Sequence, residues 1–89
     1  MKATKIKMKS GCQNSNQLCE IDSIYLEEWG QFYKKEKVYD MLMQHPKSIY
    51  VNIYPYPYLQ PVVSSLGEKY VRSEPDSSQR DNLLSLPRC

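Results

Sequence analysis

Apolar and polar residues alternate in the first segment of the chain. Within residues 5–9, Ile6 and Met8 point to one side and the lysines to the other, which is typical of a half-buried strand. Residues 10–17 are polar and contain a glycine and two asparagines, so they favour a turn. The pattern predicts a strand that ends in a turn.

The apolar residues resume at residues 18–26 but change phase in the middle. Ile21 and Ile24 would lie on opposite sides of a regular strand, although both are residues of the core type. An extra residue near Asp22–Ser23 would return both to the same side, so we expect a β-bulge there. The first two segments are then expected to form a hairpin.

Residues 27–46 change to a helical period. Apolar side chains recur at spacings of three and four, which predicts one amphipathic helix. Its inner stripe is Val38, Met41, Leu42 and His45, and its outer face holds Lys34, Lys35, Glu36 and Asp40. No Ser, Thr, Asp or Asn stands at positions 32–34 to cap the helix. Pro46 is expected to end it, because proline restricts the residue before it.

Three extended segments follow the helix. Residues 47–54 carry the strongest strand pattern in the chain, with Ile and Val alternating against Tyr and Asn. The prolines of residues 55–61 lack a ladder donor, so this stretch is expected to be an extended edge or a loop. Residues 62–73 predict a second hairpin, in which Gly67 supplies the positive φ of the turn.

Residues 70–89 predict a strand, a turn and an apolar tail that together form a structural clasp over the core. Asp81 or Asn82 is expected to cap a single helical turn, and the leucines that follow are expected to dock. The clasp residues are Asp76, Asp81, Asn82, Leu83 and Leu86. In order, the elements read β-β-α-β-β-β. They predict a single α+β domain over residues 1–89, with an antiparallel sheet of four to five strands and one helix packed on one face.

Composition and charge narrow the functions that this domain can have. A chain of 89 residues buries a thin core and leaves little room for a deep, enclosed active site. The net charge of +2 is too small to indicate nucleic-acid binding. Residues 1–9 hold four lysines, whereas residues 10–33 hold four acids and no base. We expect these groups to neutralise each other across the hairpin.

The number of cysteines and the hydropathy of the chain indicate where in the cell the protein is located. The chain has three cysteines and no CxxC motif, which argues against a disulfide framework. With a single histidine it offers no metal-ligand spacing, so neither a metal nor a cofactor is expected. No stretch approaches the roughly 20 apolar residues of a membrane helix, and no apolar run follows the basic start. These features predict a cytoplasmic protein that does not enter a membrane.

The C-terminal stretch GEKYVRSEPDSSQRDNLLSLPRC resembles the signature of a family of small uncharacterised bacterial proteins, a domain of unknown function with members among phage and mobile-element genes. The resemblance is carried by Gly67, Tyr70, Val71, Arg72, Ser73, Pro75, Asp76, Asp81, Asn82, Leu83, Leu86 and Pro87. Upstream, residues 24–52 are similar in layout and only loosely in letters. The family has Ser or Thr before the helix where this chain has Tyr33. The resemblance implies a fold and a bacterial or phage source, and it implies no reaction.

Four tyrosines stand close together after the helix. At a spacing of two they are expected to share one face of an extended segment, and they are Tyr50, Tyr54, Tyr56 and Tyr58. Exposed tyrosines provide rigid, amphipathic contact area, which favours a contact surface. The alternatives are that they cover the edge of a thin core, or that they stack on bases.

Arg72 has two interpretations. As a binding residue it would clamp an anionic ligand, because its guanidinium suits planar phosphate or carboxylate groups. As a structural residue it would pair with Asp76 or Asp81, within a turn that Pro and Asp already favour. The spacing favours the structural interpretation.

The sequence therefore predicts a small non-enzymatic binding module, since it has no glycine-rich phosphate loop and no pair of carboxylates at an enzyme-like spacing. Its partner is expected to be another protein or a second copy, and a host protein if the source is a phage or a mobile element. One alternative is sequestration of a small anionic ligand or nucleotide by Arg72 and the tyrosines. Another is weak nucleic-acid binding through lysine faces, formed by Lys2, Lys5, Lys7, Lys9, Lys34, Lys35 and Lys37.

Overall fold

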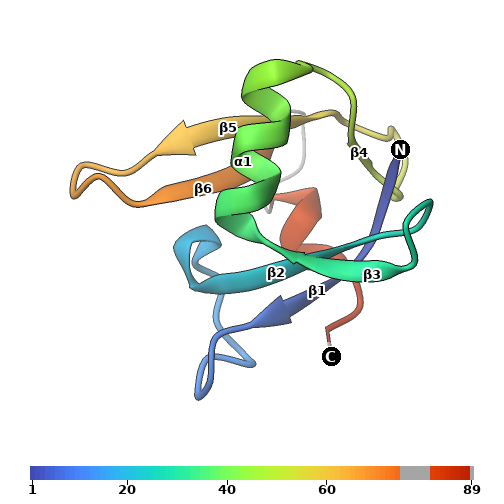
Figure 1. Cartoon of the computed structure of the whole chain (residues 1–89). Coiled ribbons are helices and arrows are strands. Elements are labelled where there is room, and N and C mark those ends of the chain that lie inside the picture. The colour runs from blue at the N-terminus through green and yellow to red at the C-terminus, as the bar shows by residue number, and fades with distance from the viewer. Residues whose placement is uncertain (75–80, 89) are drawn as a thin grey trace.

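Two β-sheets and one α-helix surround the core in the computed structural model, which describes residues 1–74 and 81–88 (Figure 1). The larger sheet has the order β3-β2-β1-β4 and the smaller one pairs β5 with β6. The elements are β1 (Lys2–Met8), η1 (Leu18–Glu20), β2 (Ile21–Leu26), β3 (Gln31–Lys34), α1 (Lys35–Gln44), β4 (Tyr50–Val51), β5 (Leu59–Val63), β6 (Lys69–Ser73) and η2 (Asn82–Ser85), where η marks a 3-10 turn. The α+β class with one helix is confirmed, and a short strand, β3, is added before the helix.

The first two strands form the predicted antiparallel hairpin, with two bulges. Lys7 pairs with Ser23 while Met8 pairs with Ile21, so Asp22 is the extra residue of β2. This confirms the bulge expected near Asp22–Ser23, which places the apolar residues of β2 together in the core. A second irregularity lies at Thr4 of β1.

The helix begins directly after positions 32–34, where its cap was expected, but an unpredicted strand precedes it. Residues 31–34 form β3, which pairs with β2, because a turn closed by Gly30 folds the chain back antiparallel. Gly30 has a φ of +63° and donates its N–H to Leu26 O. The helix then starts at Lys35 without a side-chain cap, as the absence of capping residues predicts. Lys35 is buried, so its expected place on the outer face was wrong.

The strand expected over residues 47–54 forms only at Tyr50–Val51, so the prediction is wrong on both sides of these two residues. Only β4 is a strand, and it pairs in parallel with the edge of β1, so the larger sheet is mixed rather than antiparallel. After Val51 the chain bends back on itself, and Val51 donates its N–H to Pro57 O. The prolines cause this difference, because a chain that bends to accommodate them leaves the strand direction.

The β5–β6 hairpin forms a separate layer beside α1 (Figure 1). Its turn is the predicted one, with Gly67 at a φ of +85° and its N–H donated to Ser64 O. The Ser64 hydroxyl oxygen also accepts the N–H groups of Leu66 and Glu68. Pro61 lies in β5, which has no second partner strand among the described residues, so its missing N–H breaks no ladder. The helix α1 packs against both strands of this hairpin.

The C-terminal segment closes the core beside β1. Leu83, Leu84 and Leu86 are buried, and Ile6 of β1 donates its N–H to Pro87 O. The apolar core unites all layers, and its members are Ala3, Ile6, Met8, Ile21, Ile24, Leu26, Val38, Leu42, Ile49, Val51, Leu59, Val71, Leu83, Leu84 and Leu86.

Candidate functional site

The four tyrosines of residues 50–58, called the tyrosine surface from here on, are largely exposed. Tyr54 is 82% exposed, Tyr56 51% and Tyr58 41%, while Tyr50 on β4 is half-buried. A domain of this size rarely leaves neighbouring aromatic side chains in water without a contact to make. Tyr54, Tyr56 and Tyr58 therefore do not serve mainly to cover the edge of the core, which was the alternative interpretation.

The tyrosine surface is built on a turn and not on an extended face, which corrects the expectation from spacing. The Tyr54–Pro55 peptide is cis, Tyr56 has a φ of +60°, and Tyr56 donates its N–H to Ile53 O. This turn brings the rings into contact. The centroids of Tyr50 and Tyr56 lie 6.2 Å apart and those of Tyr54 and Tyr56 lie 6.0 Å apart, both edge to face.

An open pocket of about 490 Å³ lies within this surface. It is lined by Lys2, Tyr50, Asn52, Pro55, Tyr56 and Tyr58. The ring of Tyr54 is not part of the lining, although it is the most exposed of the four. The pocket combines aromatic walls with hydroxyl and amide groups, a composition that suits a ligand with both apolar and polar parts.

A smaller pocket of about 180 Å³ adjoins the first, because Lys2 and Tyr50 line both. Its other lining residues are Met1, Glu27 and Glu28. The Lys2 ammonium lies 3.9 Å from a Glu27 carboxylate oxygen, and the amino group of Met1 donates to Ser48 O. Glu28 makes no ion pair with any residue that the structure describes. One end of the tyrosine surface therefore carries the exposed carboxylate of Glu28 without an ion pair, beside the charged groups of Met1, Lys2 and Glu27.

Arg72 does not join the tyrosine surface. It lies on β6 opposite Gln60 and is half-buried, and its Nε donates to Ser73 O over 3.4 Å. It makes no ion pair with Asp81 in the described part of the chain. Asp76, the other expected partner, lies outside the described residues.

Asp81 acts as a cap. Its Oδ1 accepts the N–H of Leu83 at 2.9 Å and the hydroxyl of Ser73 at 2.7 Å. The N–H of Ser73 also donates to the Asp81 carboxylate, at 3.2 and 3.3 Å to its two oxygens. These bonds fasten η2 to the end of β6. The C-terminal turn thus carries the side-chain cap that the sequence pattern predicts at this position.

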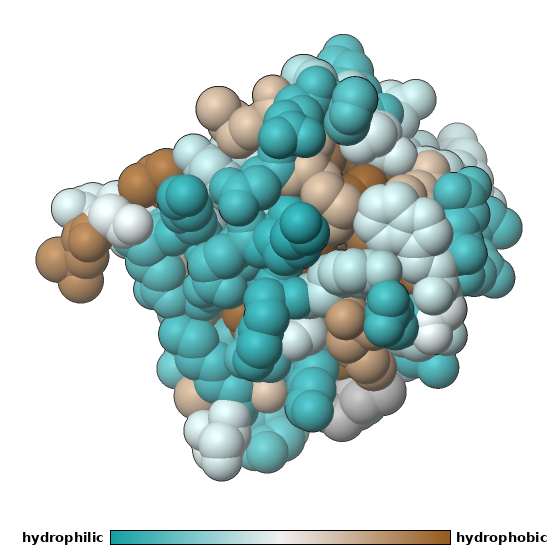
Figure 2. Space-filling view, in the orientation of Figure 1, coloured by the Kyte–Doolittle hydropathy of each residue, from teal (hydrophilic) through white to brown (hydrophobic). Residues whose placement is uncertain are grey.

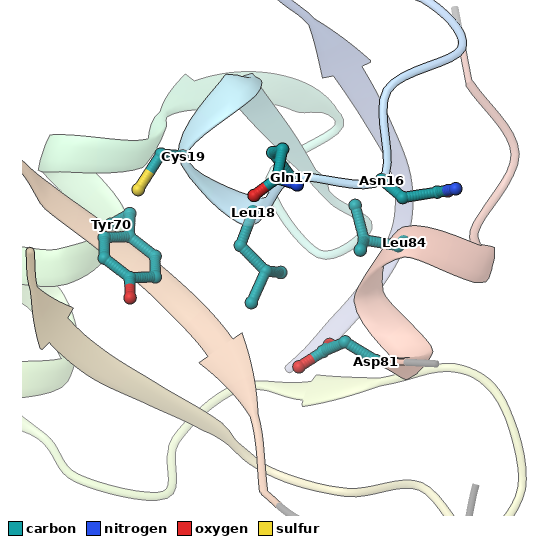
Figure 3. A pocket seen from close by; sticks show the side chains of 7 residues that line it. All are labelled: Asn16, Gln17, Leu18, Cys19, Tyr70, Asp81 and Leu84. Carbon is teal, nitrogen blue, oxygen red and sulfur yellow. The ribbon is translucent and has the colours of Figure 1, made fainter. Parts of the chain in front are cut away.

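Figure 3 shows a second pocket, of about 550 Å³, between η1, β6 and η2. The Cys19 side chain is directed toward the Tyr70 ring, and Leu18 and Asp81 extend into the space. Burial raises the pKa of the Cys19 thiol, which leaves it a weak nucleophile at neutral pH. The carboxylate of Asp81 is already occupied by its capping bonds, so the pocket holds no activated group among the described residues.

The other described cysteine is also a protonated thiol. Cys12 Sγ donates to Glu20 Oε2 at 3.1 Å, and this bond raises the pKa of the thiol. Cys12 and Cys19 are both free. Within residues 1–74 and 81–88, no group of three or more His, Cys, Asp or Glu side chains is arranged to hold a metal ion. The same residues include no helix that is long and apolar enough to cross a membrane.

An ion pair between a buried lysine and a partly exposed glutamate joins α1 to the β5–β6 hairpin, and the sequence analysis did not predict it. Lys35 Nζ lies 2.5 Å from Glu68 Oε1 and 2.6 Å from Cys19 O, and its side chain is 3% exposed. Lys9 Nζ also donates to Glu68 Oε1, at 3.0 Å. No residue pattern marks Lys35 for burial, because its partners come from 16 and 33 positions away.

Replacing Glu68 with glutamine is expected to make stability less dependent on pH in the acid range. Hydrogen bonds from Lys35 and then Lys9 lower the pKa of Glu68 in the folded protein. A lowered pKa stabilises the fold above the unfolded value, about 4.3, and this stabilisation disappears as the pH falls through the folded value. Chemical denaturation from pH 7 to pH 3 measures the free energy of unfolding of both proteins. The wild type is expected to be more stable than Glu68→Gln at pH 7, and this difference is expected to decrease below about pH 4.3.

The exposed Glu36→Gln variant is the control, since Glu36 makes no ion pair among the described residues. It is expected to stay within about 0.5 kcal/mol of the wild type throughout. A constant difference between wild type and Glu68→Gln at every pH would contradict the role given to the Glu68 charge.

The lysines do not form one continuous basic face. Lys2 approaches Glu27, Lys34 Nζ lies 2.9 Å from Asp22 Oδ1, and Lys9 pairs with Glu68. Of these three ion pairs, only Lys2–Glu27 joins the basic segment 1–9 to the acidic segment 10–33 as the charge pattern predicts, because Asp22 pairs with Lys34 and Lys9 pairs with Glu68. His45 is exposed at the C-cap of α1 and does not pack on the inner stripe, because the helix ends there.

Two other apolar features lie outside the tyrosine surface. Trp29 is 49% exposed and contacts Tyr33 edge to face at 5.3 Å, beside an open groove along α1. Figure 2 shows a mostly hydrophilic face, with hydrophobic atoms projecting at the far left, where Figure 1 places the turn of the β5–β6 hairpin. Leu66 of that turn is 95% exposed.

A family model described as "Protein of unknown function (DUF3892)" matches residues 2–87 of the chain. No curated protein matches the sequence significantly. No solved structure matches it significantly either.

Proposed function

Because the chain belongs to the DUF3892 family, for which no function is known, we propose a function from its own surface: it is a non-enzymatic module that binds a protein partner through the tyrosine surface. The observation that carries this proposal is the exposure of three neighbouring tyrosines, 82%, 51% and 41%, on a turn held by the backbone.

Tyrosine is suited to this role. Its ring contributes a large apolar contact area, its hydroxyl keeps a polar bond, and it has few torsions to immobilise on binding. The edge-to-face contacts at 6.0 and 6.2 Å hold the rings before any partner arrives. A surface ordered in advance loses less entropy when it binds.

The chemistry of the described residues supports binding over catalysis. The thiols of Cys12 and Cys19 have raised pKa values, Asp81 caps a helical turn, and His45 is exposed beyond the apolar stripe. General acid–base or nucleophilic catalysis requires an activated group near a second one. We further propose that the protein comes from a bacterium or a phage, because its C-terminal motif resembles proteins of that origin. It would then act in the bacterial cytoplasm, and its partner would be a host protein if the source is a phage.

Replacing three tyrosines together is expected to abolish partner binding. The variant is Tyr54→Ser, Tyr56→Asn, Tyr58→Ser; asparagine is chosen at position 56 because it tolerates the φ of +60°. Loss of tyrosine hot spots costs about 2 kcal/mol or more, which is roughly thirtyfold in affinity. The measurement is affinity capture from the cells that carry the gene, followed by calorimetry with the purified partner.

Leu66→Ser is the matched control, because it removes an exposed apolar side chain from the other end of the molecule. It is expected to retain the partner at wild-type affinity. The proposal fails if every captured protein binds the triple variant as tightly as the wild type. Size-exclusion chromatography at high protein concentration tests whether the partner is a second copy of the chain. In that case the wild type forms a dimer and the triple variant stays a monomer.

A further inference from the structure

We propose that the occupant of the tyrosine pocket is a proline-rich peptide segment in the polyproline II conformation, with a lysine or arginine beside the prolines. This inference rests on the proposed function and names the class of partner. The segment would lie with its prolines against Tyr50, Tyr56 and Tyr58 and its basic residue toward Glu28.

The aromatic walls fit the apolar part of such a segment. Proline-rich peptides dock in grooves lined by aromatic side chains, where the flat rings accept the pyrrolidine rings. Here three tyrosines and Pro55 line a single open pocket. The polyproline II conformation is already extended in water, so binding it requires little additional ordering.

The hydrogen-bonding groups of the pocket are also complementary to this ligand. The hydroxyls of Tyr50, Tyr56 and Tyr58 and the side-chain amide of Asn52 make no hydrogen bond to any residue that the structure describes. Polyproline II has no internal hydrogen bonds, so its carbonyl oxygens require donors. Proline has no N–H of its own, so a proline-rich ligand offers acceptors in excess. The pocket supplies the donors that match them.

Charge at the adjoining pocket gives the segment a direction. Lys2 and Tyr50 line both pockets, so one short peptide is able to reach the aromatic walls and the carboxylates. Glu27 is already near Lys2, at 3.9 Å, whereas Glu28 has no ionic partner among the described residues. Met1 also lines this pocket, and its amino group donates to Ser48 O. A cationic side chain of the ligand would therefore pair with Glu28.

The test is a titration of isotope-labelled protein with synthetic capped peptides, followed by amide NMR shifts. The probe is Pro-Pro-Leu-Pro-Pro-Arg, with the same residues in reverse order as a second probe, because polyproline II binds in either direction. Two matched peptides replace every proline with alanine or the arginine with glutamine. The alanine peptide is expected to lose at least about tenfold in affinity. The glutamine peptide is expected to lose about two- to fivefold, as for an exposed ion pair.

Variants of the protein locate the binding site. Tyr58→Ser and Asn52→Ala are expected to weaken the proline peptide by about tenfold or more. Leu66→Ser is the control, since Leu66 is exposed on the turn of the β5–β6 hairpin and does not line the pocket, and it is expected to bind within about twofold of wild type. Glu28→Gln should weaken the arginine peptide and leave the glutamine peptide unchanged, which isolates the ion pair. The amide spectrum of each variant shows whether it is folded.

The inference is overturned if the alanine peptide binds as tightly as the proline peptide, or if Leu66→Ser weakens binding as much as Tyr58→Ser. It is also overturned if neither probe binds. If a captured partner still depends on the tyrosine surface in that case, the proposed function survives and only the ligand class is wrong. If the triple tyrosine variant also leaves partner capture unchanged, both proposals fail.

Discussion

Replacing Leu83 with alanine is expected to lower the free energy of unfolding by about 2–5 kcal/mol. Leu83 is fully buried in η2, the last helical turn, so the change removes apolar contacts and leaves a cavity. A domain of 89 residues has about 4–13 kcal/mol of stability in total. The loss is therefore a large part of the total, and urea denaturation followed by circular dichroism will measure it.

Leu66→Ala provides the same chemical change at a position that is 95% exposed, and it is expected to alter stability by no more than about 0.5 kcal/mol. If the two leucine variants were equally stable, the C-terminal turn would not be anchored in the core. If Leu83→Ala is too unstable to purify, Leu83→Val provides a smaller cavity and is expected to give an intermediate loss of about 0.5–1.5 kcal/mol.

Lys35→Met is expected to destabilise the protein by about 1.5–3 kcal/mol, although methionine fills a similar volume. The ammonium of Lys35 bonds Glu68 at 2.5 Å and the carbonyl of Cys19 at 2.6 Å, and the substitution removes both bonds. The side chain is 3% exposed, so water cannot fully replace them. Thermal or urea denaturation at pH 7 measures the change.

The neighbouring Lys34→Met variant is the control. Lys34 pairs with Asp22 at 2.9 Å, but its side chain is 67% exposed, so the pair is worth about 0–1 kcal/mol. A loss of stability in Lys34→Met equal to that in Lys35→Met would mean that burial has no part in the effect. A gain in stability for Lys35→Met would show that its desolvation costs more than its two bonds return.

The sequence predicts those elements whose pattern arises from nearby residues. The phase slip between Ile21 and Ile24 indicates a bulge because the period of a strand is two, and the bulge lies at Asp22. Gly67 indicates the second hairpin turn because glycine accepts positive φ without strain. Both features depend on a few consecutive positions, which the sequence displays directly.

Elements decided by distant contacts were harder to predict. The alternation of residues 47–54 indicates a strand, but the parallel place beside β1 admits only Tyr50–Val51 before the chain turns toward the prolines. The same turn, and not a period of two, gathers the tyrosines. Lys35 is buried because Glu68 and Cys19 meet it from distant segments. The residues that neighbour Lys35 in the sequence do not indicate these long-range contacts.

The placement of β1 has a consequence for the order in which the protein folds. This strand pairs with β2 early in the chain, but its other neighbours are β4 and residues 87–88 near the C-terminus. During synthesis, a ribosome exposes β1 long before these partners emerge. The part of the β1 edge at Ile6 therefore stays open until residues 87–88 have left the ribosome, and the nascent chain cannot close the core before then.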